Sequence, residues 1–358
     1  MMQKALKFLF EGQIEFRLRD GTSVEGSVFI GETEFLPVET LREDEDAYRS
    51  EFARWLDELW LPEQEERRTQ ILELHGNGKR YADVRDATAR QQVVPFVGSG
   101  MSVPSGLPTW SDLLRRIREF TRIEVSKLEG LLQAAAFEEA ADLIASATNT
   151  NLLNERVEHD LRVDDLGVID GPVRLLPAIF PSLVLTTNLD DVLEQHYRQC
   201  GSGFDHVLAG QELSRYRQLK TPKAPFVLKL HGDCRRAERR VLLTAEYEAA
   251  YAPGSATREE LVLLYRSSHV LFLGSSLGPD RTVRLVAEVA RRDKSMPKHY
   301  AFLALPDFNE ARIDRENFLT ERGIYPIWYD GAHDEALTAL LAGLLDAPGA
   351  GLAKVEPA

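Results

Sequence analysis

The sequence predicts an α/β fold: a Rossmann-like, doubly wound parallel sheet with a helical insertion and a small α+β N-terminal region. Short apolar, β-branched runs alternate with helical patterns from residue 93 to residue 346, which is typical of a mostly parallel sheet covered on both faces. The first run, Val93–Val97, is followed directly by two glycines. Later runs end in polar clusters, at the strand ends where ligands of such sheets bind. These three observations predict a ligand crevice at one edge of the sheet.

The composition bounds the class of protein. The chain has 358 residues, 44% of them hydrophobic and 28% charged, which allows one large domain or two ordinary ones. Its formal net charge of −14 argues against direct nucleic-acid binding, because phosphates attract basic surfaces. Two cysteines, Cys200 and Cys234, cannot build a four-thiolate zinc site. No apolar run approaches about 18 residues and no signal-peptide profile is present, so we expect a cytoplasmic protein without a membrane span.

Residues 1–90 are expected to form a separate α+β region. Apolar and polar residues alternate over 14–19 and 24–30, and Asp20-Gly21 offers a turn between them, which predicts a β-hairpin. From Glu43 the period becomes helical. One helical face gathers six apolar residues: Tyr48, Phe52, Trp55, Leu56, Leu59 and Trp60. Such a face most often packs on its own domain, but Trp and Tyr are also enriched at subunit contacts.

The remaining elements follow from the same patterns. Thr109 or Ser111 can cap a helix that runs to Phe120. Residues 121–175 hold helical stretches without a clear strand, as either a helical insertion over the crevice or ordinary crossover helices would. Further strands are predicted at 182–190, 226–233, 269–277, 300–305 and 324–328, with helices at 191–199, 242–247, 259–265, 279–292 and 334–345. We assign residues 91–347 to this second domain and expect the Gly-, Ala- and Pro-rich tail, 348–358, to be disordered.

The glycine loop after the first strand is a candidate anion site. In Gly98-Ser99-Gly100-Met101-Ser102, two glycines permit a sharp turn and leave backbone amides to face an anion. Loops of this kind, followed by a helix, hold the pyrophosphate of dinucleotides, although glycine pairs after strands are also common as plain turns. A valine at Gly100 is expected to remove phosphate affinity with a nearly normal melting temperature, whereas a plain turn would lose stability.

Four motifs follow one another along the chain: GSGMSVPSGLP at 98–108, TTNLD at 186–190, KLHGD at 229–233 and GSSL at 274–277. Their order and spacing resemble the sirtuin (Sir2-like) family over residues 93–346. The resemblance implies a Rossmann-type NAD site with chemistry at the nicotinamide ribose and no metal. The chain has no CxxC pair for the zinc module of the family's lysine deacetylases, and Thr187 stands where the family has glutamine. It looks closer to the bacterial anti-phage branch, whose members hydrolyse NAD.

The residue types fit that chemistry. Cleavage of the nicotinamide–ribose bond passes through an oxocarbenium-like state. His231, titrating near neutrality, suits a base acting on the ribose hydroxyls, and Asn188 can orient a water or a ribose hydroxyl. Asp190 would bind the ribose or shape the nicotinamide pocket. As alternatives, Asn188 and Asp190 would cap the following helix, and His231 would be a buried structural histidine. The remaining cofactor contacts implied by the resemblance are Gly98, Ser99, Gly100, Met101, Ser102, Pro108, Thr187, Gly274 and Ser275.

We therefore expect an NAD+ glycohydrolase that releases nicotinamide and ADP-ribose and depletes NAD in bacterial anti-phage defence. The alternatives are a protein deacylase or ADP-ribosyltransferase, and a catalytically silent subunit that senses NAD or ADP-ribose. An uncontrolled hydrolase of NAD would harm its host. We therefore expect residues 1–90 to mediate homo-oligomer contacts or docking to a partner, such as a HerA-type ATPase or another defence protein.

Overall fold

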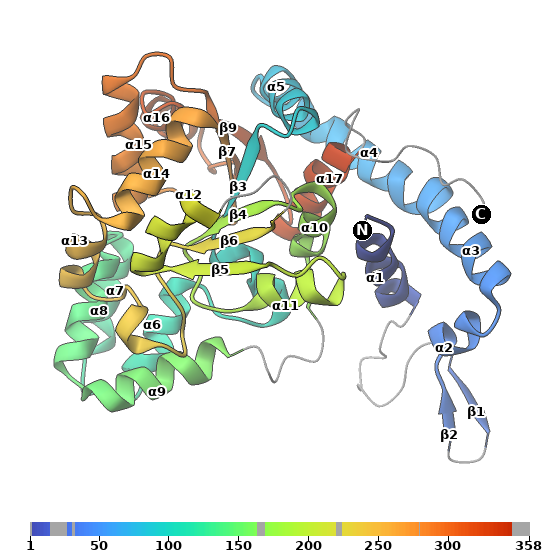
Figure 1. Ribbon diagram of the computed structural model, residues 1–358, viewed down its shortest axis with the longest axis horizontal. Helices are drawn as coiled ribbons and strands as arrows, with labels where there is room; N and C mark the ends of the chain where they lie inside the picture. Colours follow the sequence, from blue (N-terminus) through green and yellow to red (C-terminus); the bar gives the residue numbers. More distant parts are fainter. Residues whose placement is uncertain are drawn as a thin grey trace.

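A seven-stranded sheet forms the centre of the computed structural model, which describes residues 2–14, 27–30, 33–162, 169–219, 224–278 and 280–345 (Figure 1). All neighbouring strands are parallel, in the order β5-β6-β4-β3-β7-β8-β9. The strands are β3 (Val93–Val97), β4 (Leu183–Thr186), β5 (His206–Ala209), β6 (Phe226–Lys229), β7 (His269–Leu273), β8 (His299–Ala304) and β9 (Ile324–Tyr329). The predicted doubly wound α/β fold is confirmed, with β5 as an edge strand that the sequence pattern missed.

The order of the strands fixes where a ligand can bind. Without β5, the sheet has the order of a dinucleotide-binding fold, with β3 at its centre. From β3 the chain first builds β4 on one side, and after β6 it crosses to β7 on the other side. The carboxyl ends of β3, β4 and β7 therefore meet at the topological switch point, where such sheets hold their ligands.

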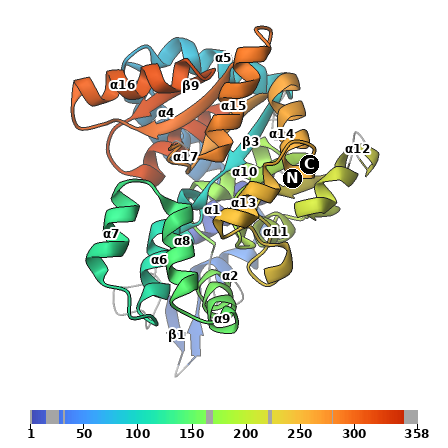
Figure 2. The same cartoon turned by 90° about the vertical axis from the view of Figure 1, so that its left-hand side faces the viewer.

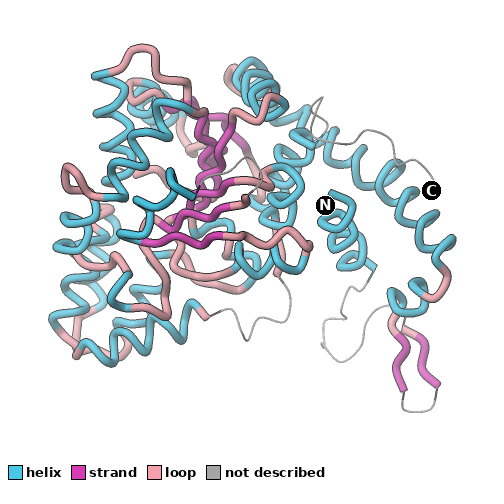
Figure 3. The backbone as a smooth tube through the Cα atoms, viewed as in Figure 1, coloured by secondary structure: helices cyan, strands magenta, loops and turns pink. Residues whose placement is uncertain are grey.

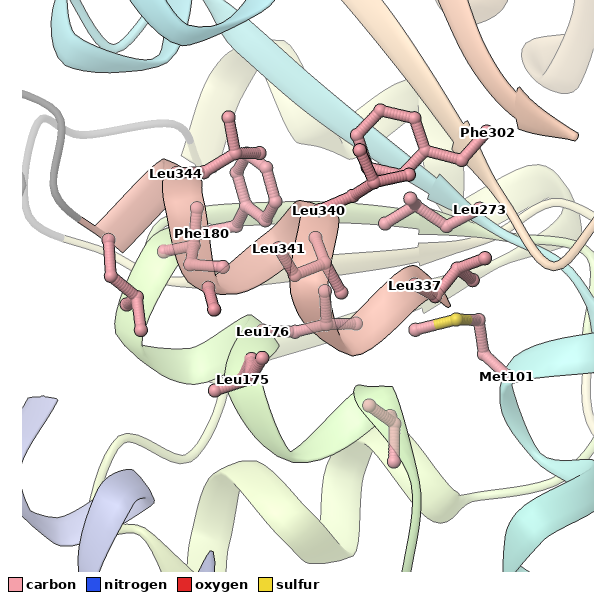
Figure 4. Packing of buried hydrophobic residues seen from close by; sticks show 14 of the residues in the cluster. Met101, Leu175, Leu176, Phe180, Leu273, Phe302, Leu337, Leu340, Leu341 and Leu344 are labelled. Carbon is pink, nitrogen blue, oxygen red and sulfur yellow. The ribbon is translucent and has the colours of Figure 1, made fainter. Parts of the chain in front are cut away.

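Helices cover both faces of the sheet. One face is covered by α5 (Asn77–Ala89), α10 (Leu176–Ile179), α11 (Val192–Gln199) and α17 (His333–Leu345). Figure 4 shows leucines of α17 packed between the sheet residues Leu273 and Phe302 and the short helix that carries Leu176. The other face is covered by α12 (Tyr216–Leu219), α13 (Thr244–Ala250), α14 (Ala256–Ser267), α15 (Arg281–Arg292) and α16 (Asn309–Thr320). None of the helices in the described ranges has the length and apolar character that crossing a bilayer requires.

A separate helical layer lies at the carboxyl ends of the strands (Figures 1 and 2). It consists of α6 (Trp110–Arg118), α7 (Val125–Gln133), α8 (Phe137–Ser146) and α9 (Thr150–Leu161). Its own apolar cluster includes Leu189 and Cys234 from the loops after β4 and β6. Two polar contacts join α8 to α15 and α13, which cover the second face of the sheet. Arg281 of α15 binds both carboxylate oxygens of Glu138, and the Thr244 amide of α13 donates to Asp142. This layer therefore packs on the loops that follow β4 and β6.

The N-terminal region lies on the opposite side of the molecule. It contains α1 (Met2–Ile14), the antiparallel pair β1 (Val28–Ile30) and β2 (Thr33–Phe35), α2 (Pro37–Arg42), α3 (Glu45–Arg54) and α4 (Leu61–Leu72). Figure 3 shows the two short strands projecting from the helices. Most of the predicted hairpin, including its Asp20-Gly21 turn, lies outside the described residues. The α1 helix was not predicted.

The aromatic stripe of the N-terminal region packs within its own chain. Phe10 of α1 lies with its ring centroid 5.4–5.5 Å from those of Tyr48, Phe52 and Trp55. Trp60 is also buried, but Leu59 is 54% exposed. The cause is a π-helical segment at 55–60, where the amide of residue 61 donates to the carbonyl of residue 56 and the wider turn shifts the register. Of the two alternatives for this helical face, packing within its own domain therefore describes these aromatic residues.

A buried histidine of β8 makes the stability depend on pH. His299 is 0% exposed, and its Nδ1 accepts from the Val270 amide at 3.1 Å. Burial lowers the pKa of His299 to about 3. Below pH 6.5 the unfolded chain therefore binds a proton at His299, whereas the folded chain binds it only near pH 3. The contribution of His299 to stability is thus fully present above pH 6.5 and is lost as the pH falls.

We expect His299→Gln to flatten this dependence by up to ~1.4 kcal/mol per pH unit between pH 6 and pH 4. Urea unfolding of both proteins at several pH values measures it. Because other groups titrate equally in both proteins, the difference between the two slopes isolates His299. Parallel stability curves would contradict the assignment.

Candidate active site

Two glycine loops at the switch point pack backbone against backbone. The Gly98 amide donates to the Leu273 carbonyl at 2.8 Å, and the Gly100 amide donates to the Gly274 carbonyl at 2.9 Å. A Cβ atom on Gly98 would lie 2.5 Å from the Gly274 oxygen, and one on Gly100 would lie 2.9 Å from the Gly274 Cα. Gly274 also has φ +63°, a conformation that favours glycine. These glycines are therefore required by the contact between the loops.

Most of the loop amides that were expected to face an anion donate to backbone carbonyls instead. Of the five amides of residues 98–102, those of Gly98, Gly100, Met101 and Ser102 donate to backbone carbonyls. Among the described residues, only the Ser99 amide of this loop is left without an acceptor. The Met101 side chain is 0% exposed and lies in the core beside α17 (Figure 4). Of the loop amides that were expected to carry a pyrophosphate, the structure therefore leaves that of Ser99 for an anion, and pyrophosphate binding itself stays a prediction.

The prediction for Gly100→Val changes accordingly. The added side chain meets backbone that cannot rotate away, so we expect a loss of about 1–3 kcal/mol of stability. The melting temperature should fall, in place of the nearly normal value that the sequence suggested. The control is Gly130→Ala in α7, where a Cβ meets nothing within 4 Å. Equal melting temperatures for the two variants would overturn this account.

The TTNLD motif places Asn188 and Asp190 just beyond β4, both at least nine-tenths buried. The Thr186 hydroxyl donates to the Val97 carbonyl and accepts from the Asn188 amide, which ties the end of β4 to β3. Asn188 Nδ2 donates to Ser102 Oγ at 3.1 Å, and Ser102 in turn bonds the Asp190 carboxylate. In the described part of the chain Asn188 Oδ1 has no partner, so this oxygen is left for a ligand.

Asp190 has the local role considered for it at the start of α11, while its role toward a ribose stays a prediction. Its Oδ1 accepts from the Val192 amide at 3.1 Å, as a helix-capping residue does. Burial raises the pKa of Asp190 to about 6, although the Lys229 ammonium opposes that shift. The carboxylate is therefore mainly ionised at neutral pH and lies one hydroxyl away from Asn188.

A buried ion cluster supports this loop from below. Lys229 is 0% exposed, and its Nζ donates to the Asp190 carbonyl at 2.6 Å and to Glu194 Oε1 at 2.8 Å. Asp233 Oδ2 lies 3.9 Å from the same ammonium. Burial lowers the pKa of Lys229, but the carboxylates outweigh this effect and leave the pKa above its usual value. The cluster was missed, although a lysine within the apolar run Phe226–Leu230 was a visible signal.

The HG dipeptide follows the neighbouring strand in register. Thr186 of β4 pairs with Lys229 of β6, so Asn188 and His231 each follow their strand pair by two residues. Gly232 has φ +85°, and a Cβ there would lie 2.1 Å from the Arg239 carbonyl oxygen, because the following loop folds back over it. The HG motif is therefore held beside the TTNLD motif.

His231 itself is held by tyrosines. Its Nε2 lies 2.9 Å from the Tyr251 hydroxyl, and the Tyr247 ring packs edge-on at 4.9 Å between centroids. Burial lowers the pKa of His231 to about 3, so the expectation that it titrates near neutrality is wrong. The imidazole is neutral at physiological pH. Tyr251 was not predicted, because it lies 20 residues further along the chain.

A hollow lies beside this centre, at the ends of β7, β8 and β9. It is an open hollow of about 200 Å³, lined by Gly274, Ser275, Ser276, Phe302, Leu303, Ala304, Tyr329 and His333. His333 begins α17, as predicted, and its Nδ1 bonds the Tyr329 hydroxyl. The sequence pattern did not assign either of these two residues to a site, although Tyr329 ends β9 and His333 lies four residues beyond it.

A second hollow of about 130 Å³ lies beyond β5 and β6, lined by Val207, Ala209, Glu212, Lys229, Asp233, Arg236 and Arg239. Of the other predicted contacts, Thr187 is half-buried beside Asn188, and Pro108 is buried ahead of α6. No cluster of three or more His, Cys, Asp or Glu side chains is placed to hold a metal ion in the described part of the chain.

Comparison with known proteins points to one family. The SIR2-like domain family matches residues 182–327. The NAD(+) hydrolase ThsA of Acinetobacter baumannii (strain 532279) is 26% identical over 213 residues, 57% of this chain and 41% of that protein. The NAD(+) hydrolase ThsA of Cytobacillus dafuensis is 24% identical over 242 residues, 67% of this chain and 46% of that protein. The matches span less than half the length of these curated relatives.

The matched segment runs from the start of β4 into β9 and contains the TTNLD, KLHGD and GSSL motifs. The resemblance that the motifs predict is therefore confirmed, and this segment of the chain is similar to SIR2-like domains.

Proposed function

We propose that this protein is an NAD+ hydrolase that cleaves the nicotinamide–ribose bond and releases nicotinamide and ADP-ribose. The observation that carries the proposal is the cluster of Asn188, Ser102 and Asp190 beside His231, at the switch point of a sheet with dinucleotide-binding order. The similar curated relatives are named NAD(+) hydrolases, which supports the same activity here.

The substrate follows the edge of the sheet. The hollow at Ser275 and His333 lies beside the switch point and would take the adenosine end. The Ser99 amide would donate to the pyrophosphate, and the nicotinamide ribose would reach Asn188 and His231. This arrangement uses the motif residues in the order in which the strands present them.

This reaction does not require a strong base. As the glycosidic bond breaks, its electron pair goes to the nicotinamide nitrogen, and positive charge develops on the ribose. The ionised Asp190 carboxylate, linked through Ser102, stabilises that charge. Asn188 Oδ1 accepts a hydrogen bond from the attacking water, whose oxygen bonds the anomeric carbon and whose proton leaves to solvent. Nicotinamide is a good leaving group, so positioning and electrostatics provide most of the catalysis.

The deciding experiment is to incubate the purified chain with NAD+ and to identify the products by mass spectrometry. Nicotinamide and ADP-ribose in equal amounts are expected. ADP-ribosylated protein or an O-acyl-ADP-ribose would indicate the transferase or deacylase alternative. Tight NAD binding by calorimetry without nicotinamide release would indicate a silent sensing subunit.

We further propose that the enzyme acts as the NAD-depleting effector of a cytoplasmic bacterial defence system and is controlled by assembly through residues 1–90. Because Trp55 and Trp60 are buried within their own chain, a contact with another copy or with a HerA-type ATPase must use exposed residues such as Leu59 and Phe35. Replacing Leu59 and Phe35 with serine and measuring the mass in solution tests this surface. An unchanged mass, partner binding and activity would exclude it.

A further inference from the structure

A chain of hydroxyl groups leads from His231 away from the crevice. Tyr251 Oη lies 2.9 Å from His231 Nε2 and 3.1 Å from Thr282 Oγ1. Tyr251 immediately follows α13, and Thr282 belongs to the first turn of α15. Both residues are more than nine-tenths buried. Three side chains from three segments are thus joined by two hydrogen bonds.

Counting protons assigns a direction to this chain. Each hydroxyl has one proton to donate, and a neutral imidazole has one protonated nitrogen. If Nε2 donated to Tyr251, Tyr251 would donate to Thr282, and the Thr282 proton would have no acceptor among the described residues. In the opposite direction Thr282 donates to Tyr251, and Tyr251 donates to Nε2. Both buried hydroxyl protons then have an acceptor, which is the rule for buried polar groups, and the imidazole proton lies on Nδ1.

The neighbouring polar groups do not compete for the hydrogen bonds from Thr282 to Tyr251 and from Tyr251 to His231. The polar groups that face these hydrogen bonds from the packed elements are Tyr247 of α13, Tyr265 of α14, Asp280 and Arg281 at the start of α15, and Glu138 of α8. Asp280 accepts from the Val283 amide, and Arg281 and Glu138 bind each other through two hydrogen bonds. Burial raises the pKa of Tyr251, so its hydroxyl keeps its proton.

We propose that Thr282 and Tyr251 hold His231 as its Nδ1–H tautomer, so that the imidazole presents a hydrogen-bond donor to the crevice. In the described part of the chain Nδ1 has no partner and remains in contact with solvent. The ligand atom that it takes is an oxygen acceptor, such as a ribose hydroxyl or a carboxamide oxygen. The identity of that ligand rests on the proposed function, but the tautomer does not.

This assignment changes the role of the histidine. A nitrogen that already carries a proton cannot remove another from the substrate, and Nε2 is occupied by Tyr251. His231 therefore orients an oxygen of the ligand, in place of the base that the sequence suggested. Tyr251 and Thr282 are positioning residues that act through it.

The test is the tautomer itself, read by NMR of the full chain labelled with ¹⁵N-histidine at pH 7. His231→Gln assigns the signal. We expect the wild-type Nε2 to show the shift of an unprotonated nitrogen. Tyr251→Phe removes the donor, so the signal should move toward the Nε2–H tautomer that free imidazole side chains prefer. Tyr265→Phe is the matched control, because the buried Tyr265 hydroxyl has no partner within the described residues.

A wild-type Nε2–H signal would overturn the proposal, as would a Tyr251→Phe signal identical to that of the wild type. If Tyr251→Phe does not fold, Thr282→Val frees the Tyr251 hydroxyl to turn and should give a mixture of tautomers, which Thr282→Ser restores to one. We also expect Tyr251→Phe to slow NAD cleavage by roughly 10- to 100-fold, as loss of a residue that orients a functional histidine does. If no NAD cleavage occurs at all, the proposed function fails while the NMR result still decides the tautomer.

Discussion

Replacing Lys229 by Met is expected to lower the free energy of unfolding by about 3–5 kcal/mol, the cost of leaving a buried partner charge uncompensated. Glu194 would lose the ammonium 2.8 Å from its Oε1, and its Oε2 has no partner within the described residues. The Asp190 carbonyl would also lose its donor. Urea denaturation measures the effect.

Two variants separate the charge from the packing. Lys229→Met combined with Glu194→Leu removes both charges, and we expect it to recover most of the lost stability, because apolar replacements of buried ion pairs are often neutral. Lys127→Met removes an exposed lysine and should be nearly silent. If the single and double variants unfold at the same urea concentration, charge pairing is not what Lys229 contributes.

Asn188→Ala is expected to reduce nicotinamide release by about 100-fold or more, the scale of losing a group that positions a reactant. The side chain donates only to Ser102, and its Oδ1 is the oxygen left for the ligand in the described structure. The melting temperature should change little. Initial rates of nicotinamide release, with melting curves beside them, provide the measurement.

The matched control for this prediction is Asn149→Ala. Asn149 caps α9 through the Leu152 amide, so its loss should cost about 1 kcal/mol of stability and leave turnover intact. A turnover of Asn188→Ala within tenfold of the wild type would remove Asn188 from the reaction.

Most of the sheet could be predicted because its strands are apolar runs that end in glycine or polar residues. Val93–Val97 and His269–Leu273 have that form and lie side by side in register. The edge strand β5 could not be predicted, because four residues that begin with histidine make a weak pattern. The helix α1 was missed although Leu6 and Phe10 are four residues apart and both buried, because the alternation that begins at Ile14 suggested a strand.

The sequence could predict which residues form the candidate site, but not their protonation states or ion pairs. The motifs that carry Asn188 and His231 are neighbours because the strands before them pair, and both strands are visible in the sequence as apolar runs. The pKa of His231 depends on burial beneath Tyr251, and the pairing of Lys229 depends on Glu194, 35 residues earlier. Desolvation and ion pairing arise only from tertiary contacts, so neither could be derived from spacing.

The contact between the two glycine loops has a consequence for mutational tolerance. A Cβ on Gly98 or Gly100 collides with backbone atoms of Gly274, and no substitution at a second position can delete a backbone atom. At Gly343, whose φ is not positive, the obstacles nearest to an added Cβ are instead side-chain atoms of Arg68 and Tyr81. A genetic selection should therefore yield second-site suppressors that trim those side chains. None should arise for the switch-point glycines.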